Sequence, residues 1–327
     1  MKARWLGFLA MGAFLIAAPV VQAEITIKFS HVVSEDTPKG KGANMFRDKV
    51  AERLGGKVKV EVFPSSQLYN DKDVLKALLR NDVQLAAPSL SKFGRFTKKY
   101  GVFDLPFLFK NTDSVQCFTE GEKGKELLKA AGNKGYLGLA YWMNGMKQIS
   151  ANKPLGVPSD AKDQKFRVMS SDVLVAQFEA IEANPQKMAF SEVYNALQTG
   201  VIDGQENTWS NMYTKKFFEV QKNISESNHG VLEYLVVTNS KFWNGLPDDI
   251  RAELDKILAE VTVEVNKLAL EKAAADRKKI VESGKTTVTV LTEEQLEQWR
   301  KAMQPVWSKF EDEIGKDTID AVLACNK

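Results

Sequence analysis

Apolar and polar residues alternate in the segment "EITIKFSHV" (residues 24–32), which puts Ile25, Ile27 and Phe29 on one face. A period of two is typical of a half-buried strand. The next segment, residues 34–56, carries apolar residues at helical spacing and ends in two glycines, as many helices do. We therefore expect a strand followed by an amphipathic helix.

This order repeats through the first hundred residues. A second alternating stretch covers residues 57–66, a second helical pattern covers residues 70–82, and residues 83–93 predict a buried strand. Strands that alternate with helices favour a mostly parallel sheet with helices on its faces. The N-terminal third of the chain therefore predicts an α/β fold.

The pattern restarts after an irregular segment that contains Pro and Gly, at residues 150–164. Strands are expected at residues 165–170 and 230–239. From Asp248 to Ser283 a helical pattern runs without Pro or Gly. At about 1.5 Å per residue, such a helix would exceed roughly 50 Å and could lie across two domains.

Residues 1–23 have the pattern of a secretory signal peptide. They begin with Lys2 and Arg4, continue with an apolar run and end in Val-Gln-Ala, which predicts cleavage after Ala23. An N-terminal membrane anchor is the alternative, but the run is short for a span and is interrupted by Gly and Pro. We expect an exported chain of about 304 residues, which is enough for two domains.

The remaining chain carries a net charge of about +1, because the leader holds two basic residues and no acidic one. A nucleic-acid-binding surface needs a basic excess on one face. The charge balance therefore argues against a nucleic-acid partner.

The sequence contains two cysteines, Cys117 and Cys325. An oxidising compartment would permit a disulfide between them. Their separation along the chain says nothing about their distance in space, so both the bridged and the free form remain open.

Motifs of enzymes and metal sites are absent from the sequence. Its two histidines, His31 and His229, form no metal-binding motif, and no nucleophile elbow or phosphate-binding loop occurs. We therefore expect no catalysis, no cofactor and no metal. A secreted hydrolase that uses His31 remains as an alternative, because catalytic triads are defined by geometry and not by spacing.

Polar side chains instead gather where the predicted strands end, and ligands of α/β domains bind at strand ends. Together they suggest a cleft that presents hydroxyl, amide and basic groups to a small anion: His31, Ser89, Ser91, Lys147, Arg167 and Asn207. Arg167, in "KFRVMSS", allows two interpretations. It lies either on the solvent face of a strand or inside the cleft.

Residues 165–211, "KFRVMSSDVLVAQFEAIEANPQKMAFSEVYNALQTGVIDGQENTWSN", resemble the solute receptors of tripartite ATP-independent periplasmic (TRAP) transporters, of the C4-dicarboxylate type. "FSHVVSEDTPKGKGA", "PSSQLYNDKDVL" and "YWMNGMKQISANKPL" follow in family order, so the resemblance covers the whole exported chain. It implies two α/β domains that close on a ligand, with a long helix across both. The corresponding division is residues 24–144 with 233–272, and residues 145–232 with 273–327.

The resemblance also implies roles for single residues. Arg167 would form a paired interaction with a substrate carboxylate, and Asn207 would hold the same carboxylate. Lys147 would supply a second cation for the far carboxylate, and Phe190 would line the cleft. Trp209 departs from the residue expected after "ENT", and with Met169 and Phe190 it could line a more apolar pocket.

The expected protein is therefore a periplasmic receptor that acts as a monomer. It would bind a C4-dicarboxylate such as succinate, malate or fumarate and deliver it to the membrane subunits of a TRAP transporter. The alternative ligand on the same fold is another organic acid, namely an aromatic, keto or sugar acid.

Overall fold

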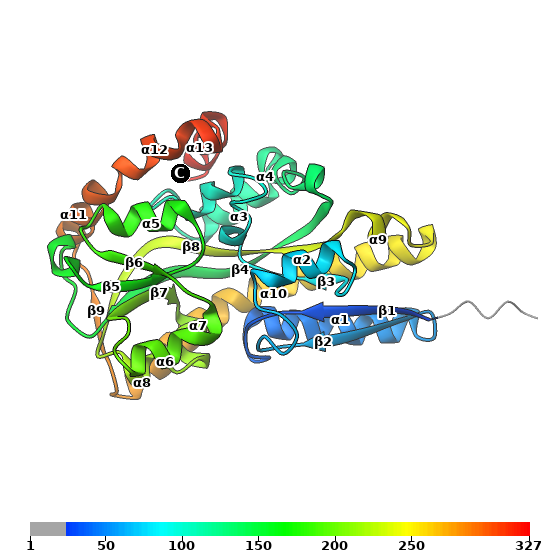
Figure 1. Cartoon of the computed structure of the whole chain (residues 1–327), viewed down its shortest axis with the longest axis horizontal. Coiled ribbons are helices and arrows are strands. Elements are labelled where there is room, and N and C mark those ends of the chain that lie inside the picture. Colours follow the sequence, from blue (N-terminus) through cyan, green and yellow to red (C-terminus); the bar gives the residue numbers. More distant parts are fainter. Residues whose placement is uncertain (1–23) are drawn as a thin grey trace, which may run out of the picture.

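The computed structural model describes residues 24–327, and Figure 1 shows their arrangement. The predicted signal peptide, residues 1–23, lies outside the described residues. No helix within residues 24–327 combines the length and the apolar character that a membrane span requires.

One mixed sheet runs through the described part of the chain, in the order β2-β1-β3-β8-β4-β7-β5-β6, with β9 also paired to β8. Its strands are β1 (Ile25–Ser30), β2 (Val58–Phe63), β3 (Leu85–Ala86), β4 (Tyr136–Ala151), β5 (Lys165–Val168), β6 (Asn184–Lys187), β7 (Gly204–Thr208), β8 (Asn223–Asn239) and β9 (Thr287–Val290).

The long antiparallel strands β4 and β8 join the two ends of this sheet. Their pairing runs from Tyr136 opposite Asn239 to Ala151 opposite Asn223. At one end β1 pairs in parallel with β2 and β3, and at the other β5 pairs in parallel with β6 and β7. The expected α/β fold is confirmed, and its sheet is mixed, with both parallel groups in one sheet.

The helices are α1 (Pro38–Leu54), α2 (Asp73–Leu79), α3 (Thr112–Glu120), α4 (Glu122–Leu127), α5 (Asp172–Glu179), α6 (Val193–Gln198), α7 (Trp209–Thr214), α8 (Phe217–Val220), α9 (Ser240–Asn244), α10 (Asp248–Glu282), α11 (Glu293–Met303), α12 (Pro305–Ile314) and α13 (Lys316–Ala324). The predicted long helix is α10, and it matches the expected range to within one residue.

Helix α10 contacts both ends of the molecule, as expected. It packs on α1 near its start, on β4 in its middle and on α7 beyond it. Arg53 of α1 pairs with Glu260 of α10 at 2.7 Å, and Arg277 of α10 pairs with Glu226 of β8 at 2.7 Å. The helix therefore supports the sheet along most of its length.

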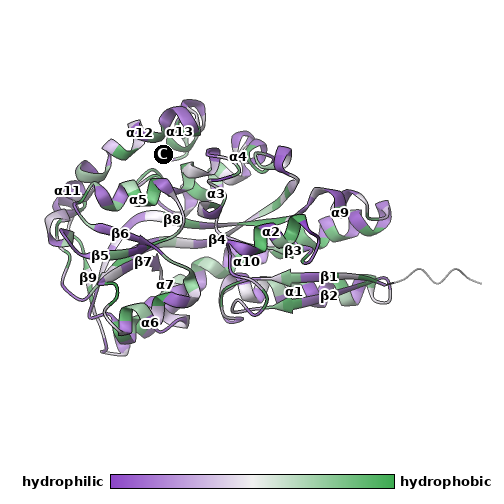
Figure 2. Ribbon diagram, in the orientation of Figure 1, coloured by the Kyte–Doolittle hydropathy of each residue, from purple (hydrophilic) through white to green (hydrophobic). Residues whose placement is uncertain are grey.

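The hydrophobic core is continuous between the two ends. One buried cluster contains Ile27 of β1 and Trp142 of β4 together with Phe166 of β5 and Trp299 of α11. Hydrophobic positions concentrate along β1 and around β3 and α2 (Figure 2). The division into two domains at the residues named above stays a prediction.

The C-terminal helices form a strap, here defined as residues 293–325, and Cys117 and Cys325 form a disulfide at its end. The Cα atoms of the two cysteines lie 5.8 Å apart. Along the strap, Trp299 Nε1 donates to the carbonyl of Gly156 at 3.0 Å, and Trp307 Nε1 donates to that of Pro106 at 2.8 Å. The strap is therefore attached to the rest of the molecule at Gly156, Pro106 and Cys117.

Candidate ligand-binding site

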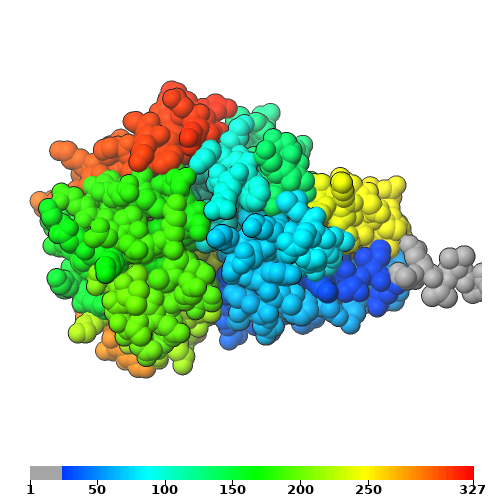
Figure 3. All heavy atoms as spheres, viewed as in Figure 1, coloured from blue at the N-terminus to red at the C-terminus, as the bar shows by residue number. Residues whose placement is uncertain are grey.

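A cavity of about 1070 Å³ opens between two walls that come from different parts of the chain. Figure 3 shows these parts, blue to cyan and green, meeting on one face of the molecule. The N-terminal wall comprises lining residues between Val32 and Lys98, and the central wall comprises lining residues between Lys147 and Asn211. Leu232 and Tyr234 of β8 complete the lining.

Arg167 is buried and lines this cavity, which excludes the solvent-face interpretation. Its side chain is 2% exposed. Nε and Nη2 donate to the carbonyl of Met188 at 3.1 and 3.0 Å. A guanidinium has five N–H groups, so three remain, and two of these are the parallel donors of the edge formed by Nη1 and Nη2. No ion pair occupies that edge within residues 24–327.

The local sequence explains the position of Arg167. Strand β5 ends one residue later, and Ser171 then caps α5 by accepting a hydrogen bond from the N–H of Leu174. The short strand thus delivers Arg167 to the carboxyl end of the sheet, where α/β folds bind ligands. Burial lowers the pKa of the Arg167 guanidinium to about 10, against the opposing effect of Glu206 and Asp71. Arg167 therefore remains cationic at neutral pH.

Asn207, at the end of β7, offers an amide donor to the same cavity. Its Oδ1 accepts from the Thr208 N–H at 3.1 Å and from Asn211 Nδ2 at 2.9 Å. These contacts fix the orientation of the amide. No hydrogen bond within the described residues uses Asn207 Nδ2, so this group is left for a ligand.

Lys147 also lines the cavity, but a carboxylate already compensates its charge. Lys147 Nζ lies 2.7 Å from Glu206 Oε2, and both side chains are 1% exposed. His229 Nε2 lies 2.9 Å from the same oxygen, and the Ser227 hydroxyl lies 2.8 Å from Nδ1. Because a carboxylate can only accept, Nε2 donates to Glu206 and Nδ1 accepts from Ser227.

Two of the three groups in this cluster, Lys147 and Glu206, form a buried ion pair. Burial alone would raise the pKa of Glu206, but Lys147 and His229 together lower it to about 2. Burial also lowers the pKa of His229. Glu206 therefore remains a carboxylate and His229 stays neutral at neutral pH. Because Lys147 is paired with that carboxylate, it is not the free second cation that was expected.

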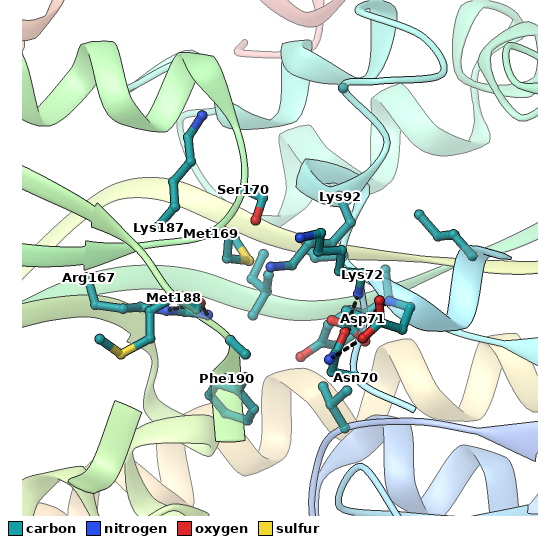
Figure 4. Close-up of a pocket in the computed structure, with 18 of the residues that line it drawn as sticks. Asn70, Asp71, Lys72, Lys92, Arg167, Met169, Ser170, Lys187, Met188 and Phe190 are labelled. Atoms are coloured by element: carbon teal, nitrogen blue, oxygen red, sulfur yellow. Dashed lines mark hydrogen bonds between the residues drawn. The ribbon is translucent and has the colours of Figure 1, made fainter. Parts of the chain in front are cut away.

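Lys92 is a cation that the sequence reasoning missed. It is half-buried, lines the cavity from the N-terminal wall and forms no ion pair within residues 24–327. Burial, and then the nearby Arg167 guanidinium, lower the pKa of Lys92 to about 8. Figure 4 shows Lys92 and Arg167 on opposite sides of the cavity. The only available clue was the position of Lys92 directly after the "PSLS" strand end.

Three further residues of the predicted site also line the cavity: Phe190, Met169 and Ser89. The Phe190 ring lies 5.9 Å from the guanidinium carbon of Arg167 and forms an apolar border beside it. Ser89 donates to Ser91 at 3.0 Å, and Ser91 donates to the buried Asp104 at 2.6 Å. Ser91 supports Ser89 from behind and does not itself line the cavity.

His31 and Trp209 are likewise absent from the cavity lining. His31 is buried, and neither ring nitrogen has a hydrogen-bond partner within the described residues. Burial, and then Lys39, lower its pKa to about 3. With no group to orient it, His31 lacks the surroundings of a general base. Trp209 is buried at the start of α7, with the Arg277 guanidinium carbon 5.7 Å from its ring.

The cavity therefore has the groups that a receptor for a small organic anion needs. It presents a buried guanidinium edge, an oriented amide and a second cation, and residues 24–327 contain no cluster of three His, Cys, Asp or Glu side chains that could hold a metal. Comparison with known proteins agrees with this class. The chain belongs to the bacterial extracellular solute-binding protein family 7, whose sequence profile matches residues 29–313.

Individual relatives are similar over nearly the whole chain. The C4-dicarboxylate-binding periplasmic protein DctP of Vibrio cholerae serotype O1 is 56% identical over 320 residues, which cover 98% of this chain and 96% of the relative. A TRAP periplasmic solute-binding protein of Shewanella oneidensis, solved with bound succinate, is 55% identical with a TM-score of 0.92, covering 93% of this chain and all of that one.

A second solved TRAP solute-binding protein, from Pseudomonas aeruginosa PAO1, contains bound L-malate. It is 47% identical, has a TM-score of 0.85, and the match covers 87% of this chain and 99% of that one. The chain is thus a TRAP solute-binding protein, and its family transports solutes and is not one of enzymes.

Proposed function

We propose that this protein is the receptor that binds a C4-dicarboxylate, such as succinate, malate or fumarate, and delivers it to the membrane subunits of a TRAP transporter. The observation that carries the proposal is the free Nη1–Nη2 edge of Arg167, which is buried, cationic and directed into the cavity. The predicted leader would export the protein to the periplasm, where it would act as a monomer.

The first carboxylate binds at the central wall. The Arg167 edge offers two parallel donors, which match the two oxygens of a carboxylate in charge and in geometry. The free Nδ2 of Asn207 donates to the same group. Hydrogen bonds to charged groups contribute about 1.5–3 kcal/mol each, so these contacts bring micromolar affinity, roughly −8 kcal/mol, within reach.

The second carboxylate is bound by Lys92 and not by Lys147. Lys147 is already paired with Glu206, whereas Lys92 lies across the cavity from Arg167 and has no carboxylate partner within residues 24–327. A diacid held this way touches both walls at once. Ligand binding therefore favours the arrangement in which the walls are close, because only that arrangement makes both sets of contacts.

A thermal-shift and calorimetric panel tests the proposal. Residues 24–327 are mixed with succinate, malate and fumarate, with the monoacid butyrate, and with galactonate and orotate as larger acids. A ligand that binds only the folded state raises the unfolding temperature. We expect the diacids to raise it and butyrate to leave it unchanged. A shift with the larger acids alone would exclude the dicarboxylate, and no shift with any acid would exclude the anion site.

A further inference from the structure

Lys39, at the start of α1, is buried directly beneath the ring of Tyr234. Its Nζ lies 3.5 Å from the ring centroid, and the side chain is 1% exposed. Its hydrogen-bond partner is the carbonyl of Ala87, at 2.8 Å. Burial of a cation is unfavourable, and the positive end of a helix dipole makes it more so in the first turn. Lys39 therefore occupies a costly position.

The hydroxyl of Tyr234 has its hydrogen unused within the described residues. Its Oη accepts from Asn144 Nδ2 at 3.1 Å and from Asn211 Nδ2 at 3.3 Å. A phenolic hydroxyl accepts and also donates. No acceptor within residues 24–327 takes this hydrogen, and Tyr234 lines the cavity. Because two amides occupy the oxygen, the O–H is available to a molecule in the cavity.

The same amides place this donor beside the carboxylate site. Asn211 Nδ2 bridges Tyr234 Oη and Asn207 Oδ1, the latter at 2.9 Å. Asn144 Nδ2 in turn bridges Tyr234 Oη and the Thr208 hydroxyl, the latter at 2.8 Å. Tyr234 and Asn207 are thus held in one hydrogen-bonded group, and both line the cavity with Arg167.

We propose that Tyr234 is a further ligand-contact residue, whose hydroxyl donates to the carboxylate held by Arg167 and Asn207, and that Lys39 is its positioning residue. This inference rests on the function proposed above. Lys39 cannot reach a ligand itself, because it is buried behind the ring and does not line the cavity. It acts through Tyr234 in two ways.

The first effect of Lys39 is mechanical. The attraction between an ammonium and an aromatic face is strongest where both are shielded from water, so Lys39 fixes the plane of the ring and the direction of the O–H. The second effect is electronic. A positive charge at the ring face draws electron density from the phenol, and the hydroxyl becomes a stronger hydrogen-bond donor to an anion.

The experiment is a double-mutant cycle with succinate as ligand, measured by calorimetry. The variants are Tyr234→Phe, Lys39→Met and the double substitution, and the unfolding temperature without ligand reports folding. We expect Tyr234→Phe to weaken binding about tenfold and Lys39→Met to weaken it severalfold. In the Tyr234→Phe background, Lys39→Met should change the affinity little, because the hydroxyl through which it acts is gone.

Tyr141→Phe is the matched control. Tyr141 is also a buried tyrosine of the central strands, and its hydroxyl donates to the carbonyl of Gly124 at 3.0 Å; neither residue lines the cavity. This control should lose stability and keep its affinity for succinate.

Two results would overturn the inference. If Tyr234→Phe binds succinate as tightly as the wild type does, the ligand contact is excluded. Equal losses for Lys39→Met in both backgrounds would make Lys39 a purely structural residue. Both differ from a failure of the proposed function, in which the wild-type protein itself binds no dicarboxylate.

Discussion

Lys147 Nζ lies 2.7 Å from Glu206 Oε2 in a part of the molecule where both side chains are 1% exposed. Removing one member of a buried ion pair leaves the other without a partner and costs about 3–5 kcal/mol. We expect Lys147→Met and Glu206→Gln each to reduce the free energy of unfolding by this amount in urea titrations without ligand. The double substitution should recover part of the loss. If Lys147→Met weakens succinate binding without any loss of stability, Lys147 is a ligand cation as first expected.

Arg167→Lys should weaken succinate binding at least tenfold, because an ammonium cannot offer the two parallel donors of a guanidinium edge. Calorimetry measures the affinity, and thermal unfolding without ligand reports the fold. Arg47→Lys is the matched control, since Arg47 lies on the exposed face of α1 beside Asp48. Unchanged affinity in the Arg167→Lys variant would show that the free edge does not bind the ligand.

Succinate affinity should fall as the pH rises through about 8, because the pKa of Lys92 is lowered to about 8. Below that pH Lys92 is a cation and attracts the dianion; above it the charge is lost, and we expect about a tenfold loss by pH 9.5, in line with one charged hydrogen bond. Burial also lowers the pKa of Lys39 to about 8. The pH dependence that remains in Lys92→Met therefore measures Lys39 together with Arg167, whose pKa is lowered to about 10.

The contribution of Lys92 and Lys39 to the stability of the ligand-free protein should rise over the pH range in which succinate affinity falls. In the unfolded chain a lysine keeps its ordinary pKa, about 10.4. Between pH 8 and 10 the unfolded state therefore binds more protons at Lys92 and Lys39 than the folded state does. The contribution of both residues to the free energy of unfolding then rises with pH. Chemical denaturation of wild type and Lys92→Met at pH 7.5 and 9.5 checks the sign.

The disulfide between Cys117 and Cys325 closes a loop with a sequence separation of 208. Long loops gain most from a cross-link, so replacing both cysteines by serine should cost about 3–5 kcal/mol of stability. The bridge lies outside the cavity lining, so succinate affinity should stay unchanged. A loss of affinity without a loss of stability would instead connect the strap to the site.

The sequence could predict that Arg167 and Asn207 line the cavity, because each position follows from a local pattern. A short strand followed by two serines places Arg167 near the carboxyl end of β5. The segment "GQEN" likewise places Asn207 near the carboxyl end of β7. His31 differs for an equally local reason. Its neighbours Val32 and Val33 line the cavity and His31 does not, so the strand end was located correctly while the side chain that lines the cavity was not.

Lys92 and Tyr234 could not be predicted because their roles depend on contacts between distant segments. Nothing near Tyr234 in the sequence indicates that Lys39 packs under its ring. Glycine weakens a strand, yet β4 continues through Gly145 to Ala151. Gly145 has a φ of 116°, and the pairing with β8 shifts register there.

Strands β4 and β8 both join the ends of the sheet and supply Lys147, Leu232 and Tyr234 to the cavity. A substitution on these strands therefore alters recognition and the mechanical link between the walls together. Phe190 and Lys92 lie on the walls and are not part of the two strands that link them. An engineer who wishes to redirect this receptor to a new acid, or to turn it into a sensor, should vary the walls and leave the two long strands intact.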